Sequence, residues 1–406
     1  MKIAILHYSV PPIVGGVESV IAHHARLMSA GGHSVRLIAA LGESLSEQIP
    51  LTILPLAGSR HACVLEMKKQ LDRGEVTAKF ESLRDELVEQ LRNTLLDLDI
   101  LIAHNVCSLN KNLALTAALC QLHISQKLPR LILWHHDLAW TTPRYQPELH
   151  DGYPWDLLRQ DWGKITHIVV STQRRAELAN LMKIEPALIH VIPNGVDAAR
   201  FYKLGSQTEV LLEQTHLLGA APILLLPVRV TPRKNIELAL YTLAELQKQF
   251  PNAALLVTGP LGPHNANNRK YLEMLLTLRT QLGLQGSVYF LAELVDSYLP
   301  DEVIADFYRI ADALFFPSRE EGFGIPLIEA AFSHLPAFCA DIPPLRELGL
   351  DDATFFSPDE DPAKVANLLA EYFRSSSTAR LSMRARSSFR WEAIYRQHIA
   401  PLLEKG

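Results

Sequence analysis

Two glutamates, Glu321 and Glu329, lie eight positions apart in the segment SREEGFGIPLIEA, residues 318–330. An apolar strand precedes this segment, and Pro326 suits the first turn of a helix, where its missing N–H is not needed. The helix start would present backbone amides to an anion such as a phosphate, while both carboxylates contact other parts of the same ligand. These amides belong to Phe323, Gly324 and Ile325. The alternative is an ordinary helix start with an acidic residue near its dipole.

Two cations follow another candidate strand, at residues 222–228. Arg229 and Lys234 flank a Thr-Pro turn in PVRVTPRKNIELAL, which leads into a helix. Cations beside a helix N-terminus suit a diphosphate, because Arg and Lys form charge-assisted hydrogen bonds with phosphate oxygens. In a plain surface loop the same side chains would be solvated charges.

Weaker candidates follow strands in the N-terminal half. Gly15 and Gly16 separate the first strand from the first helix, where the backbone could approach a phosphate or an acceptor. They do not form the GxGxxG dinucleotide fingerprint. The segment WHHD ends another strand with His135, His136 and Asp137. A histidine beside a carboxylate could donate to a sugar hydroxyl. Which of the two histidines does so stays open, and a structural histidine is the alternative.

Two further features can be explained without a ligand site. Asp97 and Asp99 form a D-x-D, but they precede the strand at 100–104 and therefore lie at the wrong edge of a parallel sheet for a ligand. No metal site is expected there or elsewhere. Four of the five tryptophans fall within residues 134–162. They could form a sugar-stacking wall or pack under a long loop.

Composition narrows the class of protein. A chain of 406 residues is too long for one compact core, so two domains are expected. The net charge of −5 argues against nucleic-acid binding. The four cysteines are widely spaced without a CxxC, which favours reduced thiols and a cytoplasmic location. The N-terminal apolar run predicts a strand rather than a signal peptide. Balanced charges in the segment 60–96 leave at most peripheral membrane contact.

Strand-like apolar runs alternate with helical patterns throughout, which predicts βαβ units and parallel sheets. A cluster of Pro, Asn and Gly in IPNGVDAARFYKLGSQ, residues 192–207, places the domain boundary near residue 200. Ligand sites are expected at the carboxyl ends of the strands. The predicted strands span residues 2–7, 34–40, 100–104, 130–135, 166–171 and 188–192, then 222–228, 253–258, 287–291, 313–316 and 336–339.

With these motifs the chain resembles, over nearly its whole length, the retaining GT-B glycosyltransferases of family 4. The most specific match is the E-x7-E signature from Glu321 to Glu329. Supporting matches are Gly15-Gly16, Arg229 and Lys234, IPNGVDAARF, and the terminal FRWEAIYRQ. The resemblance implies an α/β fold of two Rossmann-like domains whose parallel sheets face each other across a cleft. Residues 1–200 would bind the acceptor, residues 201–387 would bind the donor, and a helix at 388–406 would cross back onto the first domain.

The resemblance also implies roles. Arg229 and Lys234 would hold the donor diphosphate and stabilise the leaving group. Glu321 would contact hydroxyls of the transferred sugar, Glu329 those of the ribose, and His136 the 6-hydroxyl. Gly15 and Gly16 would shape the acceptor side and approach the phosphate. The remaining residues of the predicted donor site are Asp137, Asn194 and the amides of Phe323, Gly324 and Ile325.

The implied reaction moves a hexose from a nucleoside-diphosphate sugar to a glycan, a lipid-linked glycan or a small glycoside, with retention at the anomeric carbon. UDP-glucose is the favoured donor and GDP-mannose the next, in bacterial polysaccharide or glycoconjugate synthesis. No cofactor, metal or protein nucleophile is expected. One alternative is a sugar-nucleotide epimerase on the same fold. Another is a non-catalytic sugar-nucleotide-binding partner of an assembly complex, which the intact set of Arg229, Lys234 and Glu321 argues against.

Overall fold

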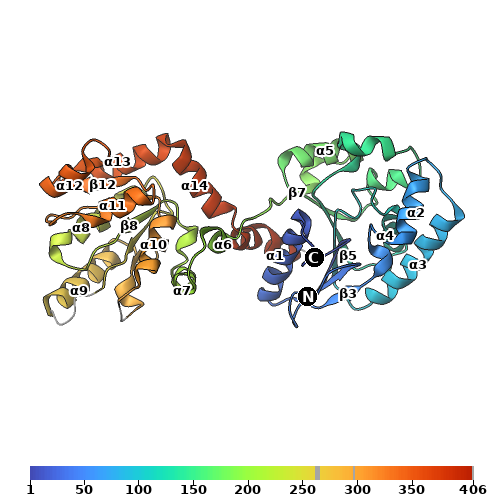
Figure 1. The fold of residues 1–406 in the computed structure, drawn as a ribbon, viewed down its shortest axis with the longest axis horizontal. Coiled ribbons are helices and arrows are strands. Elements are labelled where there is room, and N and C mark those ends of the chain that lie inside the picture. The colour runs from blue at the N-terminus through green and yellow to red at the C-terminus, as the bar shows by residue number, and fades with distance from the viewer. Residues whose placement is uncertain (261–265, 296–297, 405–406) are drawn as a thin grey trace. The chain divides into compact units, whose positions relative to one another are not determined.

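The computed structural model describes residues 1–260, 266–295 and 298–404, and the chain divides into two compact units (Figure 1). Unit 1 comprises Met1–Gly195 and the C-terminal segment that begins at Trp391, and unit 2 comprises Val196–Arg390. The division therefore falls after Gly195 rather than after residue 200, and the chain rejoins unit 1 at Trp391 rather than at 388. Gly195 lies flat against the Trp391 ring, since an added Cβ would lie 2.6 Å from Cδ2 of that ring.

Unit 1 is built on a seven-stranded parallel sheet in the order β3-β2-β1-β4-β5-β6-β7. Its strands are β1 Lys2–Leu6, β2 Ser34–Ala39, β3 Leu51–Ile53, β4 Ile100–His104, β5 Arg130–His135, β6 Thr166–Val169 and β7 Ile189–Val191. Its helices are α1 Gly16–Ala30, α2 Ala62–Leu71, α3 Ala78–Thr94, α4 Leu113–Ile124, α5 Thr172–Met182, α15 Trp391–Ile394 and α16 Ala400–Glu404, with a π-helical turn at Tyr395–Ile399.

Helices cover both faces of this sheet, and the strand residues alternate between them. On β1, Ile3 and Ile5 pack with α1 and with the C-terminal segment, including Trp391. Ala4 and Leu6 of the same strand pack with α2, α3 and α4. Because both faces are buried, the strands are continuous apolar runs rather than alternating ones.

Unit 2 is built on a six-stranded parallel sheet in the order β10-β9-β8-β11-β12-β13 around a single hydrophobic core. Its strands are β8 Ile223–Leu226, β9 Ala254–Val257, β10 Val288–Phe290, β11 Ala313–Phe316, β12 Ala337–Ala340 and β13 Thr354–Phe356. Its helices are α6 Ala198–Tyr202, α7 Ser206–Thr215, α8 Ile236–Gln247, α9 Ala266–Gln281, α10 Asp301–Ile310, α11 Ile325–Phe332, α12 Pro343–Gly349, α13 Pro362–Ser375 and α14 Ser377–Ser388.

The predicted α/β class with two parallel sheets is confirmed. Every predicted strand coincides with an observed one. The sequence pattern missed β3 and β13, which have three residues each and are too short to show a periodicity. That the two sheets face each other across a cleft stays a prediction. Within the described ranges, no helix has the length and apolarity needed to cross a membrane.

Candidate functional site

The central strands of unit 2 bring its predicted site residues to one edge of the sheet. β8 and β11 are neighbours and run parallel, with Leu224 opposite Ala313. The loops that follow them therefore leave from the same edge, where parallel α/β sheets bind ligands. The loop after β8 carries Arg229 and Lys234, and the loop after β11 carries Glu321 and leads into α11.

Lys234 and Glu321 form a buried ion pair between these two loops. The Lys234 ammonium donates a hydrogen bond to Oε1 of Glu321, and each side chain is only 9% exposed. Burial lowers the pKa of Lys234, while the pairing with Glu321 opposes that shift. The ammonium also lies 5.7 Å from the ring centroid of Phe316 on β11. The structure thus holds a cation and a carboxylate in a fixed arrangement at the strand ends.

Hydrogen bonds to backbone carbonyls join the two loops to each other. Asn235 takes the left-handed conformation at φ 54°, and its Nδ2 donates to the carbonyls of Pro317 at 3.2 Å and Pro358 at 2.9 Å. The amide of Arg319 donates to the carbonyl of Arg233 at 2.9 Å. These bonds join segments more than 80 positions apart, so the positions of Lys234 and Glu321 depend on the whole sheet edge.

Arg229 is exposed, and within the described part of the chain no carboxylate lies at ion-pair distance from it. Its loop passes directly over Gly259, which follows β9. A Cβ at Gly259 would lie 1.9 Å from the carbonyl oxygen of Val228 and 2.5 Å from the amide nitrogen of Arg229. Sequence reasoning missed this glycine, although a glycine just after a strand is a signal of close backbone approach.

The N-terminus of α11, where an anion site is predicted, is shaped by Gly324. Gly324 precedes the helix at φ 106°, and an added Cβ would lie 2.5 Å from Cδ2 of Leu345, so only glycine fits. Pro326 lies in the first turn, and no side chain caps this end. Phe323 and Ile325 are both exposed, 55% and 59% respectively.

Glu329 lies on α11 and is oriented by a tyrosine that the sequence motifs did not indicate. The Tyr308 hydroxyl on α10 donates to Oε2 of Glu329 at 2.6 Å. Burial, followed by the bond to Glu329, raises the pKa of Tyr308. Tyr308 therefore remains a neutral donor that fixes one oxygen of the carboxylate.

In unit 1, the strand end that carries His136 is organised by β4. Nδ1 of His104 lies 3.0 Å from Nε2 of His136. Asn105, at φ 56°, accepts hydrogen bonds through Oδ1 from the amides of His136 at 2.7 Å and Asp137 at 3.2 Å. His135 instead turns inward and lies 3.1 Å from His167 through its Nε2. His136 is 9% exposed and His135 only 1%, which favours His136 as the site histidine.

Burial keeps these histidines neutral. Desolvation lowers the pKa of His136 to about 3, and it lowers the pKa of His104 and of His135 well below the usual range. A neutral pair fits the single hydrogen bond between His104 and His136, because one ring nitrogen must donate and the other must accept.

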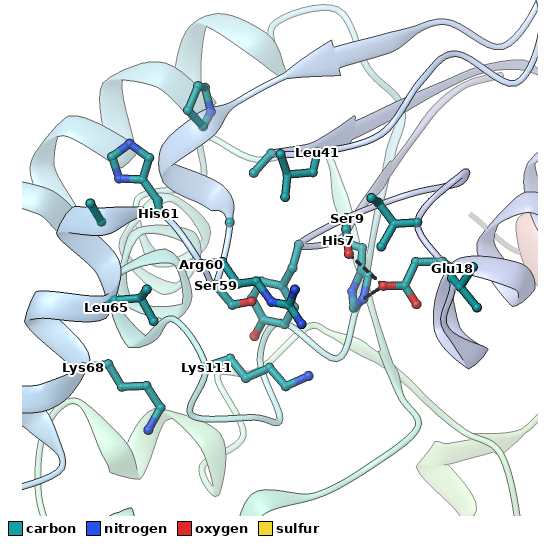
Figure 2. A pocket seen from close by; sticks show the side chains of 17 residues that line it. His7, Ser9, Glu18, Leu41, Ser59, Arg60, His61, Leu65, Lys68 and Lys111 are labelled. Atoms are coloured by element: carbon teal, nitrogen blue, oxygen red, sulfur yellow. Dashed lines mark hydrogen bonds and ion pairs between the residues drawn. The ribbon is translucent and has the colours of Figure 1, made fainter.

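A large pocket opens at the same carboxyl edge of the unit 1 sheet (Figure 2). Its volume is about 730 Å³, and the loops after β1, β2, β3 and β4 all contribute to its lining. On one side, Ser9 Oγ donates to Oε1 of Glu18 at 2.7 Å, and Nε2 of His7 lies 3.9 Å from the same oxygen. Arg60 and Lys111 also line this pocket.

None of these pocket residues was selected from the sequence. The available signal was weak: His7, Tyr8 and Ser9 follow the first strand directly, and Glu18 follows Gly15 by three positions. Gly15 lies against this wall, since its added Cβ would meet Oε2 of Glu18 at 2.0 Å. Gly16 begins α1 and has open space around it.

The remaining candidates lie apart from these clusters. Asn194 is exposed after β7, in unit 1. Asp97, before the amino end of β4, pairs with Lys2 and Arg36. Trp134 and Trp155 are buried, so packing accounts for both. The described residues contain no group of three or more His, Cys, Asp or Glu arranged to hold a metal ion.

Two family models match the chain, one over most of each unit. The model described as Glycosyltransferase Family 4 matches residues 14–200, and the model described as Glycosyl transferases group 1 matches residues 209–388. This chain is a family 4 glycosyltransferase. Its two parallel α/β units constitute the GT-B fold.

Relatives of this glycosyltransferase carry related names. It is 24% identical to the mannosylglucosylglycerate synthase of Petrotoga mobilis over 369 residues, which cover 84% of this chain and 83% of the relative. It is 31% identical to the D-inositol 3-phosphate glycosyltransferase of Nocardia farcinica over 188 residues, 46% of this chain and 40% of the relative. The solved sucrose-phosphate synthase of Thermosynechococcus elongatus aligns over 100% of this chain and 98% of its own, with a TM-score of 0.39 and 18% identity.

Proposed function

We propose that this glycosyltransferase moves a hexose from a nucleoside-diphosphate sugar to a hydroxyl of a glycan or glycoside acceptor, with retention at the anomeric carbon. The observation that carries the proposal is the Lys234–Glu321 pair at the ends of two adjacent strands of unit 2. A fixed cation, the exposed Arg229 and the uncapped start of α11 together suit a diphosphate, which bears negative charge on several oxygens.

The carboxylates suit the sugar parts of the same donor. Lys234 occupies Oε1 of Glu321, which leaves Oε2 to accept a hydrogen bond from a hydroxyl of the transferred hexose. Tyr308 occupies Oε2 of Glu329, which leaves Oε1 for the ribose hydroxyls. Each carboxylate is thereby held by one protein donor and presents one free oxygen. We further propose His136, Asp137 and Asn194 as donor-binding residues of unit 1.

The reaction breaks the bond between the anomeric carbon and the diphosphate oxygen, and it forms a bond from that carbon to the acceptor oxygen. Lys234 and Arg229 stabilise the negative charge that develops on the departing diphosphate. The acceptor proton passes to the leaving phosphate oxygen on the same face of the sugar, which preserves the configuration. No protein nucleophile or metal is needed, because Glu321 is already engaged by Lys234 and fixed cations neutralise the leaving group.

UDP-glucose is the favoured donor, and GDP-mannose is the second candidate because the name of the Petrotoga mobilis relative includes a mannosyl group. The pocket of unit 1 receives the acceptor. The reaction serves polysaccharide or glycoconjugate synthesis in the cytoplasm of a bacterium.

The test is incubation of the full chain with radiolabelled UDP-glucose and GDP-mannose, with and without a panel of glycoside acceptors. A glycosyltransferase gives labelled product only with an acceptor. Formation of an epimeric sugar without any acceptor would instead identify an epimerase. Tight binding without turnover in either arm would identify a non-catalytic binding protein, and both of those results contradict the proposal.

The metal-independent chemistry has its own control. We expect EDTA to leave the rate of transfer unchanged. A loss of activity that manganese restores would show that a metal ion, rather than Arg229 and Lys234, stabilises the charge on the leaving group.

A further inference from the structure

The unit 1 pocket has two chemically different sides. Glu18, held by Ser9 and close to His7, offers a carboxylate oxygen that can accept a hydrogen bond from a hydroxyl. The other charged groups in the lining are cations from separate segments: Arg60 precedes α2 and Lys111 follows β4. In Figure 2, Arg60 and Lys111 extend toward the side that carries Glu18.

The two cations differ from a third that lines the same pocket. Lys68 is neutralised by Asp72 and by Glu148, each at 2.7 Å, and Figure 2 shows its side chain turned away from Lys111. For Arg60 and Lys111, by contrast, the described residues include no carboxylate within ion-pair distance. The pocket therefore carries two positive charges that form no ion pair among the described residues.

The wall that contains Arg60 adds to this positive character. Gly58, Ser59 and His61 line the pocket immediately before α2, and no side chain caps the start of that helix. Its first amides and the positive end of its dipole therefore lie at the same pocket wall as Arg60. Lys111 is half-buried and lies 5.8 Å from the ring centroid of Tyr8, so part of its hydration is already lost.

We infer that this pocket binds an acceptor that carries an anionic group, a phosphate or a carboxylate, between Arg60 and Lys111, with a hydroxyl directed to Glu18. The inference rests on the proposed glycosyl transfer and specifies the class of its acceptor. A volume of about 730 Å³ is sufficient for a sugar or polyol with such a group. The Glu18 carboxylate repels the anionic end, so the ligand enters in one orientation and presents a hydroxyl rather than its acid at that wall.

The test measures binding of three probes that differ in charge at one position: glucose, glucuronate and glucose 6-phosphate. Isothermal titration calorimetry with the full chain should show that the two acids bind at least roughly tenfold more tightly than glucose, because each charge-assisted hydrogen bond adds affinity. A preference for glucose 6-phosphate over glucuronate identifies a phosphate site, and the reverse order a carboxylate site. Equal binding of all three probes, or no binding by any, overturns the inference.

Variants locate the effect. Lys111→Ala and Arg60→Ala should each weaken binding of the preferred acid roughly tenfold and leave glucose binding unchanged. Lys111→Arg should restore most of the affinity. The matched control is Lys69→Ala, which removes an exposed positive charge from α2 outside the pocket lining. If Lys69→Ala weakens acid binding as much as Arg60→Ala does, the effect is general electrostatics and the inference fails.

Failure of this inference is distinguishable from failure of the proposed function. Arg60 is not among the proposed donor contacts, so Arg60→Ala should leave nucleotide-sugar binding unaffected. If sugar nucleotides bind and transfer occurs but neutral acceptors are equally good, only the acidic acceptor class is wrong. If no sugar nucleotide binds, the proposed function itself is wrong, whatever the acids do.

Discussion

The two units bring charged residues to the carboxyl edge of a parallel sheet in different ways. In unit 2, Lys234 and Glu321 are paired, largely buried, and held in place by hydrogen bonds between their loops. In unit 1, Arg60 and Lys111 line an open pocket, and the buried polar groups beside it are neutral histidines. We interpret the rigid pair as suited to a group common to all sugar nucleotides, and the open pocket as suited to an acceptor that differs between enzymes.

Breaking the buried pair should have the largest effect. Lys234→Ala should lower kcat/KM about a hundredfold or more, because it removes a preorganised charge at the leaving group. Lys364→Ala is the matched control, since that exposed lysine pairs with Glu360 on the surface of unit 2. The double variant Lys234→Met/Glu321→Gln should keep near-native stability, as neutral replacement of a buried pair often does, yet stay inactive. Steady-state kinetics that match the control would remove Lys234 from the site.

Acid should destabilise unit 1 before unit 2. The pKa of His24 and of His136 falls to about 3 in the folded protein because both are buried, whereas an unfolded histidine titrates near about 6.5. The unfolded chain therefore binds more protons below about pH 6.5, so stability is complete above that pH and is lost as the pH falls toward 3. At pH 5 each such histidine should cost about 2 kcal/mol.

Unit 2 provides the internal comparison for this acid effect, because its described histidines, His216 and His334, are exposed. Hydrogen exchange followed peptide by peptide from pH 7 to pH 5 should show protection lost first in unit 1. His24→Phe should reduce that loss of protection. This histidine is fully buried, and neither of its ring nitrogens has a hydrogen-bond partner among the described residues. Equal loss of protection in both units would contradict the assignment.

The close approach of two loops in unit 2 should make one glycine irreplaceable. Gly259→Ala places a methyl group against the backbone of Val228 and Arg229, so the loop must move, and we expect a loss of about 1–3 kcal/mol in unfolding free energy. Gly286→Ala is the control, because that glycine has no neighbouring atom within 4 Å of the added Cβ. Urea denaturation should separate the two variants; equal midpoints would show that the loop is not constrained.

The smallest effect should come from the group that orients Glu329. Tyr308→Phe removes one hydroxyl hydrogen bond of 2.6 Å, so nucleotide-sugar affinity should fall about three- to tenfold. Tyr289→Phe removes a bond of similar length to the carbonyl of Gly286, away from the α11 N-terminus. Calorimetric titration should show a weaker donor affinity for the first variant only, and unchanged affinity would mean that Glu329 needs no such positioning.

The sequence predicted the fold well because both sheets are parallel and buried on both faces, so the strands stand out as apolar runs between amphipathic helices. It also predicted local motifs of unit 2: Pro326 in the first turn of α11, and cations after β8. Each of these features depends on residues close together in the sequence, so it can be recognised from residue types at fixed spacings.

The pocket of unit 1 could not be predicted in the same way. Arg60 and Lys111 come from two separate loops and Glu18 from the first turn of α1, and only the order of the strands brings these segments to one edge. Tyr308 was missed for the same reason, since its partner Glu329 lies on another element. A lysine such as Lys68 looks identical to Lys111 in the sequence, and only its two carboxylate partners separate them.

The most direct test of the central claim is hydrogen exchange on the full chain, with and without UDP-glucose, GDP-mannose and ADP-glucose. One of these donors should slow exchange at the loop that carries Arg229 and Lys234 and at the loop from Glu321 to Glu329, and Lys234→Ala should abolish that protection. Exchange left unchanged by every donor, or slowed only at segments outside these two loops, would contradict the claim that unit 2 holds a sugar nucleotide through the ends of β8 and β11.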